Sequence, residues 1–205
     1  MITSLREFIP LIELALISTL LISYLSKGLY KSQSTSSIRL ITLLAVFIFL
    51  LLPLDAIFTG NLPWKLPLIA YVRAATGDLS ISTLLLCLLG LGHFKKIQIN
   101  TNFVFLIGIC ALVFYPLALG VSMIDPYAWG YGSIIFISSV TLIAGLFIWR
   151  HSLLEGVVIS IAMIAWSFQW HESTNLWDYL IDPFLGVWAI IYSIRIFIRS
   201  KSSIY

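Results

Sequence analysis

The chain has 205 residues, of which 60% are apolar and only 10% are charged, and its mean hydropathy is +1.02. Because about a quarter of the residues in soluble proteins are charged, this composition excludes a soluble globular domain and indicates an integral membrane protein. The formal net charge of +3 does not indicate a nucleic-acid partner, since the basic residues are scattered as ones and twos in separate segments. The first partner that the sequence predicts is therefore the lipid bilayer.

Seven apolar stretches are long enough to be membrane-spanning helices, because a helix needs roughly 20 residues to cross about 30 Å of hydrocarbon. The connections between them are short, so residues 1–205 are expected to form a single transmembrane helical domain with no soluble domain. The predicted fold class is all-α, a polytopic bundle of about seven transmembrane helices. The predicted spans are 8–26, 40–58, 68–92, 103–122, 132–149, 154–170 and 179–198.

Two acidic residues lie within the first two predicted spans. Glu13 falls about one helical turn inside the first span, beyond Pro10, and has no basic residue on the same helical face one turn away. Asp55 follows Pro53 in a run of leucines in the second span. An ionisable group at such a depth is costly and by default suggests a function or a specific partner. We predict that both are intramembrane acidic residues and that Glu13 faces the protein interior or a water-filled cavity.

The third stretch contains an arginine, a glycine and an aspartate near its middle. It is either one helix, or Gly77 and Asp78 begin a shorter helix that Asp78 caps, while 68–76 lies in the interface or re-enters the membrane. Arg73 and Asp78 are close in both cases. They would form a structural ion pair, or Arg73 would bind a phosphate or carboxylate, which its planar guanidinium suits.

The fifth and sixth spans are joined by a very short connection. Little more than Arg150, His151 and Ser152 separates them. The two helices are therefore expected to pack as an antiparallel hairpin.

The basic residues are divided unevenly between the two ends of the predicted spans. By the positive-inside rule the richer side is cytoplasmic, which places the N-terminus outside and the C-terminus in the cytoplasm. We expect the membrane to be a bacterial inner (plasma) membrane. The basic residues of the cytoplasmic side are Lys27, Lys31, Arg39, Lys95, Lys96, Arg150, Arg195, Arg199 and Lys201, and those of the outer side are Arg6, Lys65 and Arg73.

The acidic residues are distributed in the opposite way, and only Glu155 falls on the inner half. Asp125 and Asp182 each precede a proline, which is typical of a turn or a helix start. The outer face is thus predicted to be acidic. Its acidic residues are Glu7, Glu13, Asp55, Asp78, Asp125, Glu172, Asp178 and Asp182.

The segment 169–183 is the richest in polar groups. It contains His171 beside Glu172, and Asp178 and Asp182 one turn apart, on one face of the start of the seventh predicted helix. A histidine with carboxylates can hold a divalent metal or transfer protons. No recognised ligand spacing such as HExxH is present, and a hydrogen-bonded structural cluster explains the same residues. Whether a cofactor binds stays unknown, with a divalent metal as one alternative.

Aromatic residues gather on the same side of the predicted membrane. Trp166 and Trp170 lie one turn apart at the end of the sixth span, beside the acidic segment. Such residues form the usual interfacial belt, and aromatic faces beside carboxylates also suit a sugar or a lipid headgroup.

No motif in the sequence specifies a substrate or a reaction, but three functions fit the outer acidic and aromatic face. The first is an enzyme acting on a lipid or lipid-linked envelope substrate at the outer leaflet. The second is a non-catalytic membrane subunit or scaffold that docks a larger membrane or extracytoplasmic protein. The third is a proton- or cation-coupled carrier using the intramembrane acids, although the fourth and fifth spans offer it almost no polar residues.

The enzyme hypothesis assigns roles to particular residues. We expect the polar groups of the third, sixth and seventh spans to converge on one outward-opening pocket. The predicted catalytic residues are Asp78, His171, Glu172, Asp178 and Asp182, and the predicted substrate-binding residues are Arg73, Trp166 and Trp170.

Overall fold

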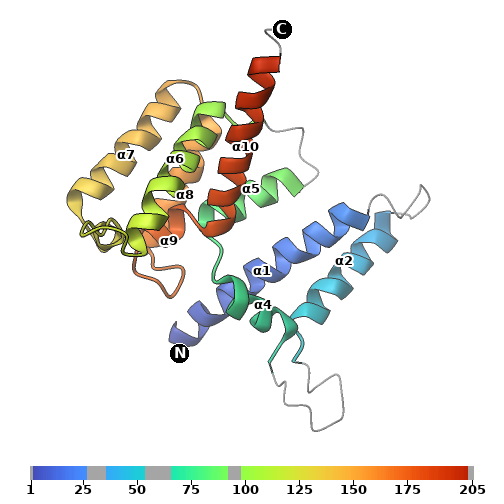
Figure 1. Ribbon diagram of the computed structural model, residues 1–205. Coiled ribbons are helices and arrows are strands. Elements are labelled where there is room, and N and C mark those ends of the chain that lie inside the picture. Colours follow the sequence, from blue (N-terminus) through green and yellow to red (C-terminus); the bar gives the residue numbers. More distant parts are fainter. Residues whose placement is uncertain (1, 27–35, 54–65, 92–97, 203–205) are drawn as a thin grey trace. The chain divides into compact units, whose positions relative to one another are not determined.

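The computed structural model describes residues 2–26, 36–53, 66–91 and 98–202 (Figure 1). Within these ranges every regular element is a helix, apart from one isolated bridge between Pro53 and Pro67, so the predicted all-α class is confirmed. The α-helices are α1 (Ile2–Ser26), α2 (Ser36–Leu51), α4 (Leu68–Thr76), α5 (Ile81–Leu91), α6 (Thr101–Ala118), α7 (Ile134–Trp149), α8 (Leu153–Ser167), α9 (Trp177–Leu180) and α10 (Pro183–Ser202), and a 3₁₀ helix, η1, covers Tyr127–Gly130.

Two described helical stretches are long and apolar enough to cross a membrane. They are Glu7–Leu25 in α1 and Thr101–Ala118, which is α6. A third is added if α4 and α5, which are bent by 119° at their break, count as one span. The remaining apolar helices have 10–17 residues each. The seven-span bundle is therefore not confirmed, and the orientation stays a prediction.

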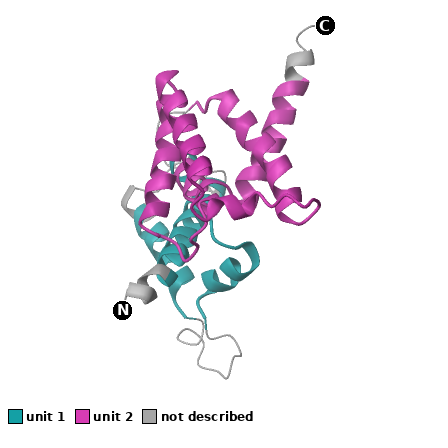
Figure 2. Cartoon of the chain, turned by 90° about the vertical axis from the view of Figure 1, so that its left-hand side faces the viewer, with its two compact units in different colours: residues 1–79, 87–95 teal, residues 80–86, 96–205 magenta. Residues whose placement is uncertain are grey.

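The chain divides into two compact units (Figure 2). Unit 1 consists of residues 1–79 and 87–95, and unit 2 of residues 80–86 and 96–205. The boundary falls within α5. Each unit has its own buried apolar core, and each is described separately below.

In unit 1, α1 packs against α2 and α4. The core is formed by Leu14, Ala15, Leu50, Ile69 and Leu79. These residues lie far apart in the sequence, so burial of their side chains against one another holds the three helices together.

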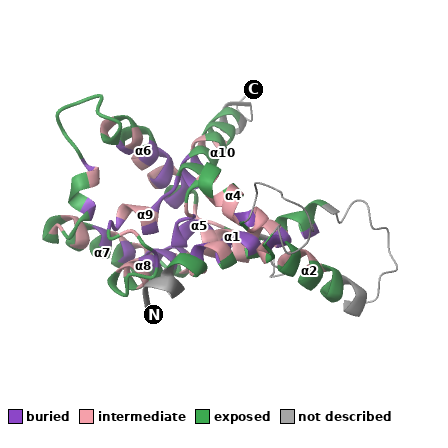
Figure 3. Cartoon of the chain, turned by 90° about the horizontal axis from the view of Figure 1, so that it is seen from below, coloured by how far each residue is buried: buried purple, intermediate pink, exposed green. Residues whose placement is uncertain are grey.

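In unit 2, the most extensive contact between two helices is that of α6 with α10, which run antiparallel. A Cβ atom added to Gly186 would lie 3.0 Å from the Cβ of Ala111, and one added to Gly108 would lie 3.4 Å from Oγ of Ser193. Small residues let two backbones approach closely, as in helix pairs of membrane proteins. The outer faces of both helices are exposed (Figure 3).

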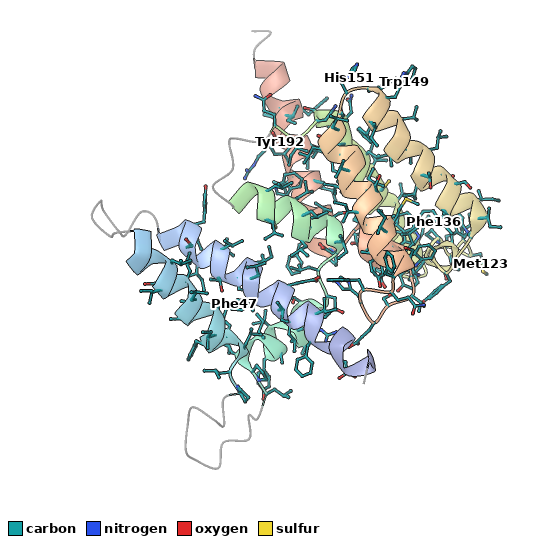
Figure 4. The ribbon with its side chains drawn as sticks, turned by 180° about the vertical axis from the view of Figure 1, so that it is seen from behind. Phe47, Met123, Phe136, Trp149, His151 and Tyr192 are labelled. Carbon is teal, nitrogen blue, oxygen red and sulfur yellow. The ribbon has the colours of Figure 1, made fainter. Side chains whose placement is uncertain are left out.

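The second helix pair of unit 2 is the predicted hairpin of α7 and α8, which the structure confirms. A Cβ atom added to Gly156 would lie 2.4 Å from the Ile148 side chain, so glycine is required at this crossing. The turn is a Schellman motif, in which His151 has a φ of 61° and Ser152 donates its N–H to the carbonyl of Phe147. Figure 4 shows His151 and Trp149 together at this turn, with Phe136 toward the other end of the hairpin.

Two of the predicted spans are interrupted in the structure. The third breaks between α4 and α5, where Gly77 has a φ of 75°, which is the alternative that the Gly77–Asp78 pair had indicated. Ser80 rather than Asp78 precedes α5, and its hydroxyl accepts the N–H of Thr83 at 3.1 Å, as an N-cap residue does. The seventh breaks at Ile181, which is extended, so the helix expected from residue 179 begins at Pro183.

Candidate functional site

The predicted pair in the third span is a bidentate ion pair within unit 1. Arg73 Nε lies 2.5 Å from Oδ1 of Asp78, and its Nη2 lies 3.0 Å from Oδ2. The guanidinium also donates to the backbone carbonyl of Glu7 at 3.4 Å. The two side chains are 21% and 29% exposed, so the pair is half-buried at the break between α4 and α5. The two parallel hydrogen bonds fix the orientation of the guanidinium, and the carboxylate of Asp78 neutralises its charge.

Of the two acids predicted within the membrane, Glu13 is buried among the core residues of unit 1, with 8% of its surface exposed. Its predicted interior position agrees with this burial. Asp55 lies outside the described residues.

The remaining predicted site residues lie in unit 2, in or beside a pair of packed loops. The α6–α7 connection, residues 119–133, and the segment 168–182 between α8 and α10 form this pair, which we call the loop platform. Leu176 donates its N–H to the carbonyl of Gly130 at 2.9 Å, and Trp177 Nε1 donates to the carbonyl of Pro126 at 2.9 Å. The two loops are thus joined by backbone and side-chain hydrogen bonds.

Asn175 is the residue that ties the loop platform together. It is fully buried, and its Nδ2 donates to the carbonyl of Tyr127 at 2.9 Å while its Oδ1 accepts the N–H of Trp177 at 3.0 Å. A Cβ atom at Gly130 would lie 1.7 Å from this Oδ1, so only glycine permits the approach. The ring of Trp177 also packs against those of Phe114 and Phe136, with centroids 4.3 and 4.5 Å away and ring planes tilted by 30° and 31°.

Asp178, a predicted catalytic residue, accepts two hydrogen bonds on one carboxylate oxygen. Oδ2 accepts the hydroxyl of Tyr127 at 2.9 Å and that of Ser173 at 2.5 Å. Burial, and after it the negative charge of Asp178, raises the pKa of Tyr127 above its ordinary value of 10.0. This phenol is therefore held as a hydrogen-bond donor to the aspartate.

His171 and Glu172 are adjacent but lie in different environments. His171 is 1% exposed, and its ring stacks on Tyr179 with centroids 5.1 Å apart. Its backbone N–H donates to the hydroxyl of Tyr179 at 3.0 Å, and this hydroxyl donates to the carbonyl of Ser173 at 2.9 Å. Glu172 is exposed. Of the two, only Glu172 has a side chain that an external molecule can reach.

Asp182 connects two helices. Its Oδ1 accepts the N–H of Leu185 at 2.8 Å in the first turn of α10, and its Oδ2 accepts the N–H of Ser80 at 2.8 Å at the start of α5. The residue is only 4% exposed. It thus caps α10, as the following Pro183 predicted, and satisfies a second buried donor from a distant part of the chain.

The two tryptophans predicted to bind substrate differ in role. Trp166 Nε1 donates to the carbonyl of Thr174 at 2.8 Å, which holds the segment 168–182 against the end of α8. Trp170 is 47% exposed. Only the second presents a large aromatic surface at the loop platform.

No group of three or more His, Cys, Asp or Glu side chains that could hold a metal ion occurs in the parts of the chain that the structure describes. His171, Asp178 and Asp182 each contact different partners. Arg73 and Asp78 belong to unit 1 and the other predicted site residues to unit 2, so their convergence on one pocket stays a prediction.

Four contributors to the loop platform were not singled out from the sequence. They are Tyr127, Gly130, Ser173 and Asn175. The sequence carried a signal for two of them, since Ser173 and Asn175 are turn-forming residues between Glu172 and Trp177, where side chains commonly bond to nearby backbone N–H groups.

Compared with protein-family models, curated proteins and solved structures, the chain matches none of them, so the geometry above is the basis for a functional proposal.

Proposed function

We propose that this chain is a multi-pass integral membrane protein with seven spans and an outward-facing N-terminus, in a bacterial inner membrane. Support comes from helices that remain apolar on their exposed faces, since a helix that is hydrophobic all round is typical of a membrane span or a large core. The exposed apolar residues include Ile109, Leu112 and Val113 on α6, Ile135, Leu142 and Leu146 on α7, and Val187, Ile191 and Ile194 on α10.

The function we propose for this protein is that of a non-catalytic membrane subunit whose loop platform docks a larger membrane or extracytoplasmic partner. One observation carries this choice: both carboxylate oxygens of Asp182 and one of Asp178 accept hydrogen bonds within the fold. A catalytic acid or base must reach a proton on the substrate, whereas these groups reach Tyr127, Ser173, Ser80 and Leu185. Such bonds suit a rigid, preformed surface, which lowers the cost of association.

The exposed groups of the loop platform are those that a partner would meet. Trp129 is 49% exposed and Trp170 47% exposed, and Glu172 is also exposed. Aromatic residues of this kind commonly supply the anchors of protein interfaces.

Photocrosslinking in native membranes tests the docking proposal. A photoreactive residue placed at Thr174, which is exposed on the loop platform, should give one defined crosslinked species. The same residue at His151, exposed at the α7–α8 turn, is the matched control and should not give it. Trp170→Ala should reduce the Thr174 crosslink several-fold. Absence of the crosslink from positions 129, 170 and 174 alike would rule the proposal out.

A second candidate is an enzyme that acts on a lipid or lipid-linked envelope substrate at the outer leaflet. The half-buried Arg73–Asp78 pair favours it, because it lies at a break in an apolar helix pair, where membrane proteins often bind polar substrates. In this case Asp78→Asn and Glu172→Gln should each reduce turnover of membrane lipids while the protein remains folded. The docking proposal instead expects lipid turnover to be unchanged by both.

Topology is tested by labelling with a membrane-impermeant maleimide in a background that lacks Cys87 and Cys110. A cysteine at Thr174 should react in intact cells, and one at His151 only after the membrane is opened. Labelling of position 151 from outside would overturn the orientation.

A further inference from the structure

The connection that follows α6 begins with an unusually exposed set of apolar side chains. Met123 is 104% exposed, Leu119 84%, Val121 77% and Ile124 56%. We call these four residues the apolar tip. Met123 lies at the periphery of unit 2, away from the packed interior (Figure 4). Contiguous exposed apolar groups on this scale mark an interaction surface rather than a water-facing loop.

We propose that the apolar tip inserts into the lipid of the membrane surface at the end of α6, resting on the membrane integration proposed above. The tip starts at the residue directly after Ala118, where one of the two helices long and apolar enough to cross a membrane ends. The apolar face of that helix therefore continues into the tip without a charged residue, since the first charged residue after α6 is Asp125.

Helix length supports lipid as the occupant. At about 1.5 Å per residue, the 18 residues of α6 cover about 27 Å and the 16 residues of α7 about 24 Å. Both fall short of the roughly 30 Å of bilayer hydrocarbon. The tip lies in the connection between these two helices and would supply apolar surface where α6 ends, which avoids the cost of mismatch.

Several backbone N–H groups of the tip are hydrogen-bonded within the turn, as insertion into lipid requires. Unpaired N–H groups are costly in lipid. Gly120, with a φ of 86°, donates its N–H to the carbonyl of Leu117, and Val121 donates to the carbonyl of Pro116, which together form a Schellman motif. The N–H of Ile124 donates to the Ser122 hydroxyl at 3.1 Å. The turn thus pairs these donors internally while its apolar side chains point out.

The residues that follow the tip match a membrane–water boundary. Trp129 and Tyr131 are 49% and 60% exposed, and both side chains combine an apolar ring with a polar atom, which favours the headgroup level. Asp125 is exposed, and its Oδ1 accepts the N–H of Tyr127, two residues later, at 2.9 Å. The order of the sequence is therefore apolar tip, charged turn, amphipathic aromatics.

Spin-label accessibility tests the inference in vesicles of phosphatidylcholine that contain this chain alone. Single cysteines at Met123, Leu112 and Thr174, with Cys87→Ala and Cys110→Ala, are labelled with a nitroxide. Collisions with oxygen, which concentrates in lipid, are compared with collisions with a water-soluble nickel chelate. The ratio of oxygen to nickel collisions should be several-fold higher at position 123 than at the exposed loop position 174, and should approach that of position 112 on α6.

The reference positions distinguish the possible failures. If position 112 is as accessible to nickel as position 174, membrane integration itself is wrong. If position 112 is in lipid but position 123 is accessible to nickel, the inserted tip is wrong and a protein partner becomes its occupant. If position 123 is shielded from both reagents and its spectrum shows spin–spin broadening, a second copy of the chain covers the tip and the lipid proposal is likewise overturned.

Discussion

The carboxylate of Asp182 accepts the backbone N–H of Ser80, a residue 102 positions earlier in the chain, at 2.8 Å. The same carboxylate caps α10 through Leu185, so one buried side chain serves the first turns of two helices. The N-terminus of a helix carries unpaired N–H groups and a partial positive charge, both of which an aspartate satisfies. This relationship explains why an acidic residue is buried here, with no need for a substrate.

Asp182→Ala should destabilise the protein by about 2–6 kcal/mol, because two buried N–H groups lose their acceptor at roughly 1–3 kcal/mol each. Asp182→Asn should have an intermediate effect, since its amide oxygen replaces only one acceptor atom. The measurement is thermal or denaturant unfolding in detergent. Asp125→Ala is the matched control, because Asp125 is exposed and should cost less than about 1 kcal/mol. Equal losses for the two aspartates would contradict the assigned role.

Gly130→Ala should disrupt the loop platform, because the added Cβ would overlap the side chain of Asn175. We expect a loss of about 2–4 kcal/mol, since displacement of Asn175 leaves buried partners unpaired. Gly145→Ala is the control: nothing lies within 4 Å of its Cβ position, and alanine should be neutral or gain up to about 1 kcal/mol in a helix.

A double-mutant cycle identifies the cause of this loss. The combined loss for Gly130→Ala with Asn175→Ala should be smaller than the sum of the two single losses, because the double variant relieves the overlap with Asn175, though not the 2.9 Å approach to Cδ1 of Trp177. If the two losses simply add, the steric explanation is wrong.

Several features of the fold could be predicted because they depend on local sequence. The apolar runs predict helices, and Gly77 beside Asp78 indicates, as one of two alternatives, a break between α4 and α5, where glycine has a positive φ. The short connection around His151 predicts the α7–α8 hairpin, because three residues leave no other arrangement for neighbouring helices.

The polar network could not be predicted because it depends on tertiary packing. Asp178 and Asp182, one turn apart in sequence, looked like one helical face, but the extended Ile181 separates them and each carboxylate has its own partners. Nothing near Tyr127 in the sequence indicates that its hydroxyl meets Asp178, 51 positions later. Partners at such separations follow only from how the helix ends pack.

The stability of the native protein should fall with rising pH above about 10 in a way that depends on Tyr127. Its pKa is raised in the folded state, so in this range the unfolded chain releases the phenolic proton while the native protein retains it. The contribution is complete below pH 10 and is lost as pH rises toward the folded pKa. Tyr127→Phe keeps the ring but removes the ionisation and the hydrogen bond to Asp178.

Unfolding free energies of the parent protein and Tyr127→Phe, measured side by side from pH 8 to pH 11, test this linkage. The parent should be more stable at pH 8, by about 1.5–3 kcal/mol for a hydrogen bond to a charged group, and its advantage should shrink above pH 10. A constant difference in unfolding free energy over the whole pH range would show that folding does not raise the pKa of Tyr127.

His151→Gly should stabilise the protein by about 1 kcal/mol, because a residue with a side chain in the left-handed region is strained by roughly that amount and glycine is not. The imidazole is exposed, so little packing is lost. His151→Ala is the control, since it removes the imidazole but keeps the strained backbone, and it should give no gain. The converse change, Gly120→Ala, introduces a side chain at a φ of 86° in the Schellman motif at the end of α6. It should cost about 1 kcal/mol. If alanine at position 151 stabilises the protein as much as glycine does, the gain comes from loss of the imidazole and not from relief of backbone strain.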